Sequence, residues 1–171
     1  MGLKTGMGKY SMADLKTIND AVIQSLAFNT EQVSDFPPYY FYQPSILVKY
    51  TNVGFGLVYS FQSTGSRVFG KDYSGEYCFD MMVKSNNFGV TGEIDLISKP
   101  KFQVLLNSNL GMVFSNLEMN EYLIVQDSVL INSMNEFKTR NCFFEPGINV
   151  MYLMYSSLGI GVNLGYYVNL G

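Results

Sequence analysis

Six charged residues are the side chains of this sequence with the clearest chemical potential. In their segments nearly every second residue is apolar. The six charged residues lie at the positions in between, together with small or polar residues. Two adjacent carboxylates can act as general acid and base, whereas carboxylates balanced by lysines form ion pairs. Because both signs are present, we interpret the group as a charge network inside the fold. The six residues are Lys49, Glu76, Asp80, Lys84, Glu93 and Asp95.

Several kinds of chemistry are excluded by composition. Histidine is absent from all 171 residues, so Ser-His-Asp hydrolysis, histidine-ligated zinc and histidine general bases lack their central residue. Cys78 and Cys142 match no metal-binding spacing, and we expect two free thiols unless the fold brings them together. The net charge of −3, with scattered Lys and Arg, leaves no footprint for nucleic acid. The sequence therefore predicts no catalytic residue, no metal and no cofactor.

The elements that carry the charges are expected to be strands with one apolar and one small or polar side. The clearest is the segment 158–170, where every second residue is apolar and most of the others are glycine or asparagine. Successive side chains of a strand point to opposite faces, so this alternation predicts a strand. The same split recurs from residue 39 onward, and 120–132 is counted as a strand with a long loop as the alternative. Tight turns are expected at 51–52, 85–87, 99–101 and 156–157, and a longer loop at 63–72. The stretch 119–141 is left open between strand and loop.

The N-terminal part is predicted to contain one helix, at about 12–26. Ser11 is a suitable N-cap, and Leu15, Ile18, Val22 and Leu26 follow at helical spacing. We expect this helix to pack over a barrel mouth. A membrane-surface helix is the alternative, although its polar face is not basic as such helices usually are.

Hydrophobicity is high but is spread along the chain. Hydrophobic residues make up 47% of the sequence, yet no apolar run approaches the roughly 20 residues of a membrane helix. Charged residues are only 15%, against about 25% in an ordinary soluble domain. We therefore predict an all-β, antiparallel up-and-down transmembrane β-barrel of about eight strands. It forms a single domain over 1–171, with its main strands over about 39–170.

The side-chain sizes predict which face of the barrel is inside. An eight-stranded barrel has an interior just wide enough for its side chains, so small residues suit the lumen and bulky apolar ones suit lipid. A Lys or Arg on the lipid face near the midplane would cost about 2–4 kcal/mol, whereas lumen charges can pair. We expect a polar, largely filled lumen. A soluble, lipocalin-like barrel that binds an apolar ligand is the alternative, with the faces exchanged.

Three places in the chain carry a resemblance to a known family: 8–16, 66–77, and 145–152 together with 159–169. On these segments the chain resembles the small outer-membrane β-barrel proteins of Gram-negative bacteria, the OmpX/OmpA-like barrel group, especially its Bacteroidota versions. The resemblance implies an eight-stranded outer-membrane barrel with no single activity. Such barrels usually end on an aromatic residue, whereas this chain ends Leu170-Gly171. A truncated C-terminus is therefore one interpretation of this difference. Including the N-terminal segment gives nine strands, although an even number is expected.

The expected function is that of a non-enzymatic protein of the bacterial outer membrane, whose partner is outer-membrane lipid. Its loops and its N-terminal helix are the expected contacts for a protein partner. The N-terminus shows no export signal, so the barrel interpretation requires a signal that has been removed. An outer-membrane enzyme built on the carboxylates is a third alternative, and a wide porin is disfavoured because the strands are too few.

Overall fold

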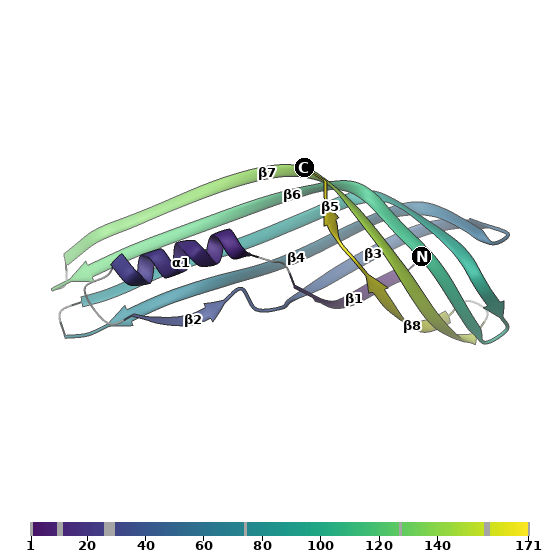
Figure 1. The fold of residues 1–171 in the computed structure, drawn as a ribbon, viewed down its shortest axis with the longest axis horizontal. Coiled ribbons are helices and arrows are strands. Elements are labelled where there is room, and N and C mark those ends of the chain that lie inside the picture. The colour runs from purple at the N-terminus through teal and green to yellow at the C-terminus, as the bar shows by residue number, and fades with distance from the viewer. Residues whose placement is uncertain are drawn as a thin grey trace.

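The fold, seen in a computed structural model, is one long antiparallel up-and-down sheet with a single helix (Figure 1). The structure describes residues 2–9, 12–25, 30–73, 75–126, 128–155 and 158–170. The elements within them are β1 (Gly2–Gly8), α1 (Ala13–Ser25), β2 (Glu31–Asp35), β3 (Tyr39–Tyr50), β4 (Val53–Lys71), β5 (Gly75–Lys99), β6 (Phe102–Val125), β7 (Ser128–Tyr155), β8 (Leu158–Gly165) and β9 (Val168–Asn169). The prediction of an all-β, up-and-down fold with one N-terminal helix is confirmed.

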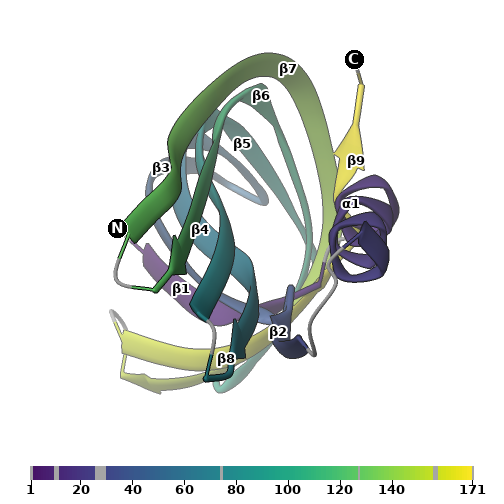
Figure 2. The ribbon, with the colours of Figure 1, turned by 90° about the vertical axis from the view of Figure 1, so that its left-hand side faces the viewer.

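Neighbouring strands pair in the order β1-β3-β4-β5-β6-β7-β8. The short strand β2 continues the line of β3 along β4, and β9 continues the line of β8 along β7. Figure 2 views the sheet along its length and shows that it is strongly curled. Among the described residues no ladder joins β1 to β8, so the curl is open at one seam. Each pairing in the order reverses the chain direction, so the two edge strands β1 and β8 run in the same direction.

Two predicted breaks are wrong, because β4 and β5 run straight through them. The expected loop at 63–72 is largely the second half of β4, and the expected turn at 85–87 lies in the middle of β5. The region 119–141 is a hairpin of β6 and β7 that turns at Gln126, whose φ is 48°. The turns at 51–52 and at 99–101 are confirmed, whereas 156–157 lies outside the described residues.

The missing turn in β5 has a physical cause in the chemistry of its two faces. Tyr77, Phe79 and Met81 face the inside of the curl, and so do Ser85 and Asn87 further along the same strand. The inner face thus changes from apolar to polar while the backbone continues. In the sequence, the apolar residues therefore move from odd to even positions, which looks like two strands separated by a turn.

The same change, from an apolar to a polar inner face, divides the whole sheet into two regions. We call the half with a polar inside and an apolar outside the belt, and the half with an apolar inside and a polar outside the extension. The belt comprises residues 2–8, 39–62, 85–115 and 141–165, and the extension comprises α1, β2 and residues 63–84 and 116–140.

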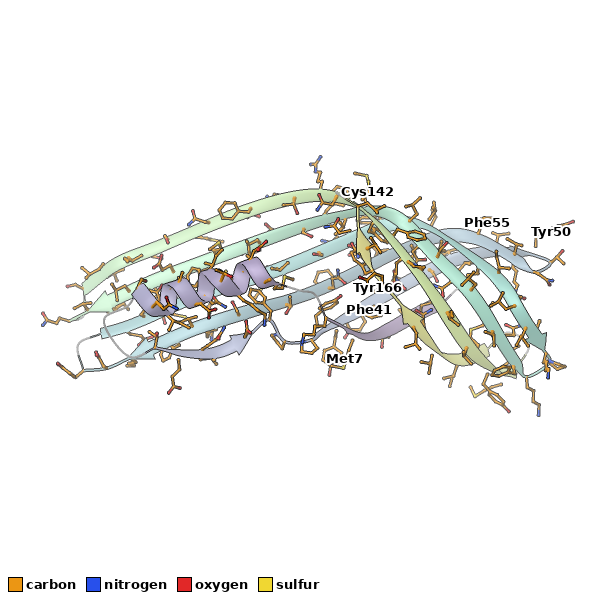
Figure 3. All side chains as sticks on the ribbon, viewed as in Figure 1. Met7, Phe41, Tyr50, Phe55, Cys142 and Tyr166 are labelled. Atoms are coloured by element: carbon orange, nitrogen blue, oxygen red, sulfur yellow. The ribbon has the colours of Figure 1, made fainter. Side chains whose placement is uncertain are left out.

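In the belt, the predicted orientation of the faces is confirmed. Phe55, Leu57 and Val162 are 69%, 66% and 67% exposed on the outer face, whereas Asn107 and Asn109 are 2% and 1% exposed inside. The labelled outer residues Tyr50 and Phe55 project from the sheet in Figure 3. A water-soluble fold rarely leaves so much apolar surface uncovered.

In the extension, α1 packs on the inner face of the sheet. Its core consists of buried residues from the sheet and from the segment after β2, covered by apolar residues of the helix and of the segment before it. Asn19 is fully buried in α1, and the Ser66 hydroxyl of β4 lies 3.4 Å from its Oδ1. Lys16 and Asp35 form an ion pair that links α1 to β2. The core residues are Phe36, Val68, Tyr77, Phe79 and Met81, and the covering residues include Met12, Leu15, Val22 and Ile23.

Candidate functional site

The inside of the belt is organised around Glu145 of β7. One carboxylate oxygen, Oε2, accepts hydrogen bonds from Gln43 Nε2 at 3.2 Å and from Asn109 Nδ2 at 2.9 Å. Gln43 lies on β3, and three strands of the sheet separate it from β7. This hydrogen bond therefore crosses the interior of the curl, and it shows that the belt is wound tightly enough for opposite walls to touch.

Other polar side chains fill the same interior in pairs. Asn87 Nδ2 donates to Ser60 Oγ at 3.0 Å, and Asn163 Nδ2 donates to Asn107 Oδ1 at 2.8 Å. At the rim of the belt, near the short turn at 51–52, Lys49 and Asp95 form an ion pair at 2.6 Å in which the Asp95 side chain is buried and the Lys49 side chain stays 40% exposed. Paired polar groups of this kind offset the cost of burying them away from water.

The six predicted charges do not form one network. Lys49 and Asp95 meet at the rim of the belt, and Glu93 faces its interior, where Lys4 of β1 is coupled electrostatically to it and to Glu145. The other three residues lie on the outer face of the extension with other partners. Asp80 pairs with Arg67 at 2.6 Å, Glu76 with Lys71 at 2.8 Å, and Lys84 with Glu118 at 2.8 Å.

This division follows from the continuity of β5. The prediction placed a turn at 85–87, which would have made two separate strands. In that arrangement residues 76, 80 and 84 of the first strand could lie on the same face as residues 93 and 95 of the second. Because β5 is one strand, residues 76, 80 and 84 point opposite to residues 93 and 95. The predicted network is therefore corrected to one ion pair at the rim of the belt and three on the outer wall of the extension.

The outer wall of the extension is an electrostatically paired surface. Lys71 and the Tyr122 hydroxyl, which donates to Glu76 Oε1 at 2.8 Å, lower the pKa of the Glu76 carboxyl. Arg67 donates to both oxygens of Asp80, at 2.6 and 2.8 Å. Burial raises the pKa of the neighbouring Cys78 thiol. A carboxylate with a lowered pKa stays ionised near neutral pH and is a poor general acid.

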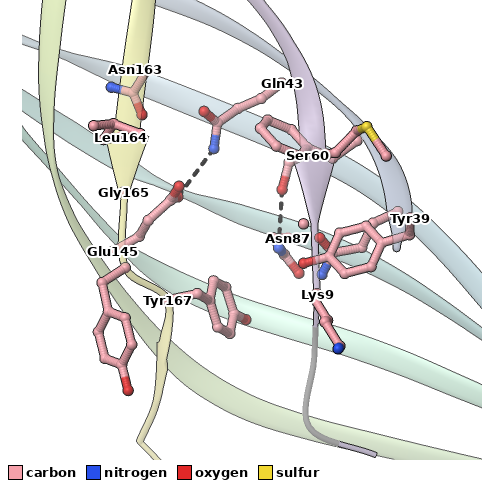
Figure 4. A pocket seen from close by; sticks show the side chains of 15 residues that line it. Lys9, Tyr39, Gln43, Ser60, Asn87, Glu145, Asn163, Leu164, Gly165 and Tyr167 are labelled. Atoms are coloured by element: carbon pink, nitrogen blue, oxygen red, sulfur yellow. Dashed lines mark hydrogen bonds between the residues drawn. The ribbon is translucent and has the colours of Figure 1, made fainter. Parts of the chain in front are cut away.

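A cavity of about 300 Å³ lies in the belt where the two edge strands approach each other (Figure 4). Its polar lining includes Gln43, Ser60, Asn87 and Glu145, and its aromatic lining includes Tyr39, which folds over Gly8 so closely that a Cβ there would lie 2.4 Å from its hydroxyl oxygen. This partly open polar cavity at the seam is our candidate site.

None of Glu145, Gln43 and Asn109 was predicted to be a site residue. The alternation of polar and apolar residues around each was visible, and it placed all three on the polar side. Their meeting depends on how tightly the sheet curls, which no local pattern reports. The expected state of the cysteines is confirmed, because Cys78 is buried, Cys142 is exposed and both are free thiols.

Comparisons with known proteins identify no relative: no family model matches the chain, and neither a curated protein nor a solved structure matches it. Among the described residues no helix is both long and apolar enough to cross a membrane. Within the same residues, no three potential metal-binding side chains of Asp, Glu or Cys come together.

Proposed function

We propose that this chain is a small integral β-barrel protein of a Gram-negative outer membrane, with the belt in the bilayer and the extension in water. The observation that carries the proposal is that the outer face changes from apolar to polar at one level on four consecutive strands. The change falls between Phe61 and Ser63 on β4, Phe88 and Asn86 on β5, Phe114 and Asn116 on β6, and Cys142 and Arg140 on β7.

The height of the apolar band fits a bilayer. Val53–Phe61 and Phe88–Leu96 are each about nine residues long, and a transmembrane β-strand needs roughly 9–11. The strands themselves are much longer, with 19 residues in β4 and 28 in β7. The surplus is the extension, whose outer wall carries the ion pairs and whose inner wall is covered by α1.

The border of the band carries aromatic and basic side chains suited to a membrane interface. Tyr59 and Phe88 pack with ring centroids 4.7 Å apart, and the Tyr59 hydroxyl donates to Asn86 Oδ1 at 2.7 Å. Arg140 lies over the Phe114 ring, 5.7 Å from its centroid. Aromatic girdles and basic residues at this depth are typical of outer-membrane barrels.

The proposed role is non-enzymatic. The belt anchors the protein, and the extension presents a helix-packed surface outside the membrane to a protein partner. A soluble, lipocalin-like carrier is supported less well, because α1 occupies the apolar interior of the extension and hydrogen-bonded amides line the interior of the belt.

The proposal is tested by placing the same charge on the outer face of each region. Leu57→Arg lies in the middle of the apolar band, and Met82→Arg lies on the outer face of the extension as its control. We expect Leu57→Arg to lose about 2–4 kcal/mol of stability in lipid vesicles, and Met82→Arg to change it by about 0.5 kcal/mol or less.

The measurement is urea unfolding of vesicle-inserted protein, followed by the mobility shift of unheated samples on detergent gels. The proposal fails if the wild-type chain is monodisperse without detergent and does not insert. It also fails if the two arginine variants are equally stable.

A further inference from the structure

The cavity at the seam combines an interior that accepts hydrogen bonds with an opening toward the outer face. It is lined from inside by Gln43, Asn87 and Glu145, and from the outer faces of the edge strands by Met7 and Leu164. Met7 and Leu164 are 61% and 76% exposed, on the apolar side of the wall. A molecule in this cavity would therefore touch the polar lumen and the lipid-facing surface together.

The interior of the cavity presents hydrogen-bond acceptors that lack donors. Asn87 is only 3% exposed, and its Oδ1 has no hydrogen-bond partner among the described residues. Glu145 receives both of its hydrogen bonds on Oε2, so Oε1 accepts none from the described chain. Gly165 faces Oε1 with no side chain, and a Cβ there would lie 3.3 Å from it. Asn87 Oδ1 is a buried acceptor without a donor, which is costly, so the site favours a ligand that supplies N–H groups.

A cation lines the same cavity. Lys9 is exposed, and it makes no ion pair within the described part of the chain. Its ammonium can bind an anionic group, while Glu145 and Asn87 bind a donor-bearing cation deeper inside. The two charges suit a zwitterion whose cationic end enters first.

The depth of the cavity agrees with this chemistry. Its lining includes Ser60 and Gln62, which flank Phe61 at the upper limit of the apolar band on β4. In the proposed membrane orientation this level is the headgroup region, and the acyl chains of a lipid would run down beside Met7 and Leu164.

We propose that the seam binds the headgroup of an aminophospholipid, with its primary ammonium in the polar interior lined by Glu145 and Asn87 and its phosphate on Lys9. This inference rests on the proposed membrane function. A choline headgroup carries the same charges but has no N–H donor, so the site distinguishes the two lipids through the ammonium hydrogen bonds.

The experiment compares binding of short-chain phosphatidylethanolamine and short-chain phosphatidylcholine to the refolded full chain by native mass spectrometry in detergent. We expect the wild type to prefer the ethanolamine lipid about tenfold, the worth of one charge-assisted hydrogen bond. Glu145→Gln should abolish that preference. Glu93→Gln, which changes a belt-interior carboxylate outside the cavity lining, should retain it.

A second variant tests the phosphate contact without altering the interior. Lys9→Gln should weaken binding of both lipids several-fold and leave the preference between them unchanged. Equal binding of the two lipids by the wild type overturns the proposal, and so does a preference that survives Glu145→Gln. A chain that does not insert into vesicles removes the proposed function as well, whereas one that inserts but shows no lipid preference removes only this inference.

Discussion

The belt and the extension are built from the same strands and have opposite chemistry. Along β5, Phe79 is buried inside the extension and Asn87 is buried inside the belt, on one face of one strand. Outside, the polar Asp80 of the extension gives way to the exposed Phe88 of the belt. The backbone hydrogen bonding continues unchanged across the border between the two regions. The one irregularity in the ladder between β5 and β6 lies at Asp95/Ile97, far from that border.

The comparison shows that the surroundings, and not the backbone, determine what each face carries. In water a sheet buries its apolar face against a helix, as the extension does with α1. In a bilayer the lipid replaces the helix as the apolar neighbour, and the polar side chains must satisfy one another inside. A single long strand can therefore lie partly in water and partly in lipid if its polar and apolar faces exchange at the membrane interface.

The largest expected effect comes from the inner face of β5. Phe79→Ala removes a buried aromatic from the core under α1 and should cost about 3–5 kcal/mol. Thr91→Ala, on the same face of the same strand in the belt, should cost no more than about 1.5 kcal/mol. Amide exchange in micelles should show the extension opening in Phe79→Ala while the belt stays protected. Equal costs at both positions would mean that the two interiors do not differ.

A smaller effect separates the two cysteines. Cys78 is buried on the wall of the extension, and burial raises the pKa of its thiol, so little reactive thiolate forms near neutral pH. Cys142 is exposed at the border of the belt. We expect a water-soluble maleimide to label Cys142 faster than Cys78 by on the order of tenfold or more. Mass spectrometry of the labelled peptides measures the two rates, and Cys142→Ser is the control that should leave the folded protein almost unlabelled.

The smallest effect concerns the acid sensitivity of the extension. The pKa of Glu76 is lower in the folded chain than in the unfolded chain, so its ion pair with Lys71 stabilises the extension above the unfolded pKa of about 4.3. This contribution is lost as the pH falls through the folded pKa. Glu76→Gln should therefore reduce the acid dependence of amide protection at the tips of β4 and β5. Identical pH profiles for the wild type and the variant would contradict the assignment.

The sequence by itself determined the period-two alternation, and with it the all-β class and the orientation of the belt faces at Phe55, Leu57 and Val162. It also predicted the helix, at 12–26, which is observed as Ala13–Ser25. These features are local, because strand parity and helical spacing are properties of neighbouring residues. The predicted lumen positions of Glu76, Asp80 and Lys84 are wrong. A polar/apolar pattern that changes phase looks like a turn whether the chain bends or the surroundings change.

Only the tertiary structure decided which polar groups meet. The contact between Gln43 and Glu145 joins residues 102 positions apart, and it exists because the sheet curls until β3 and β7 face each other. The seam between β1 and β8, and the cavity beside it, likewise follow from the curl and the strand order. Curl and strand order are set by the sum of many pairings over the whole chain, so no single segment contains them.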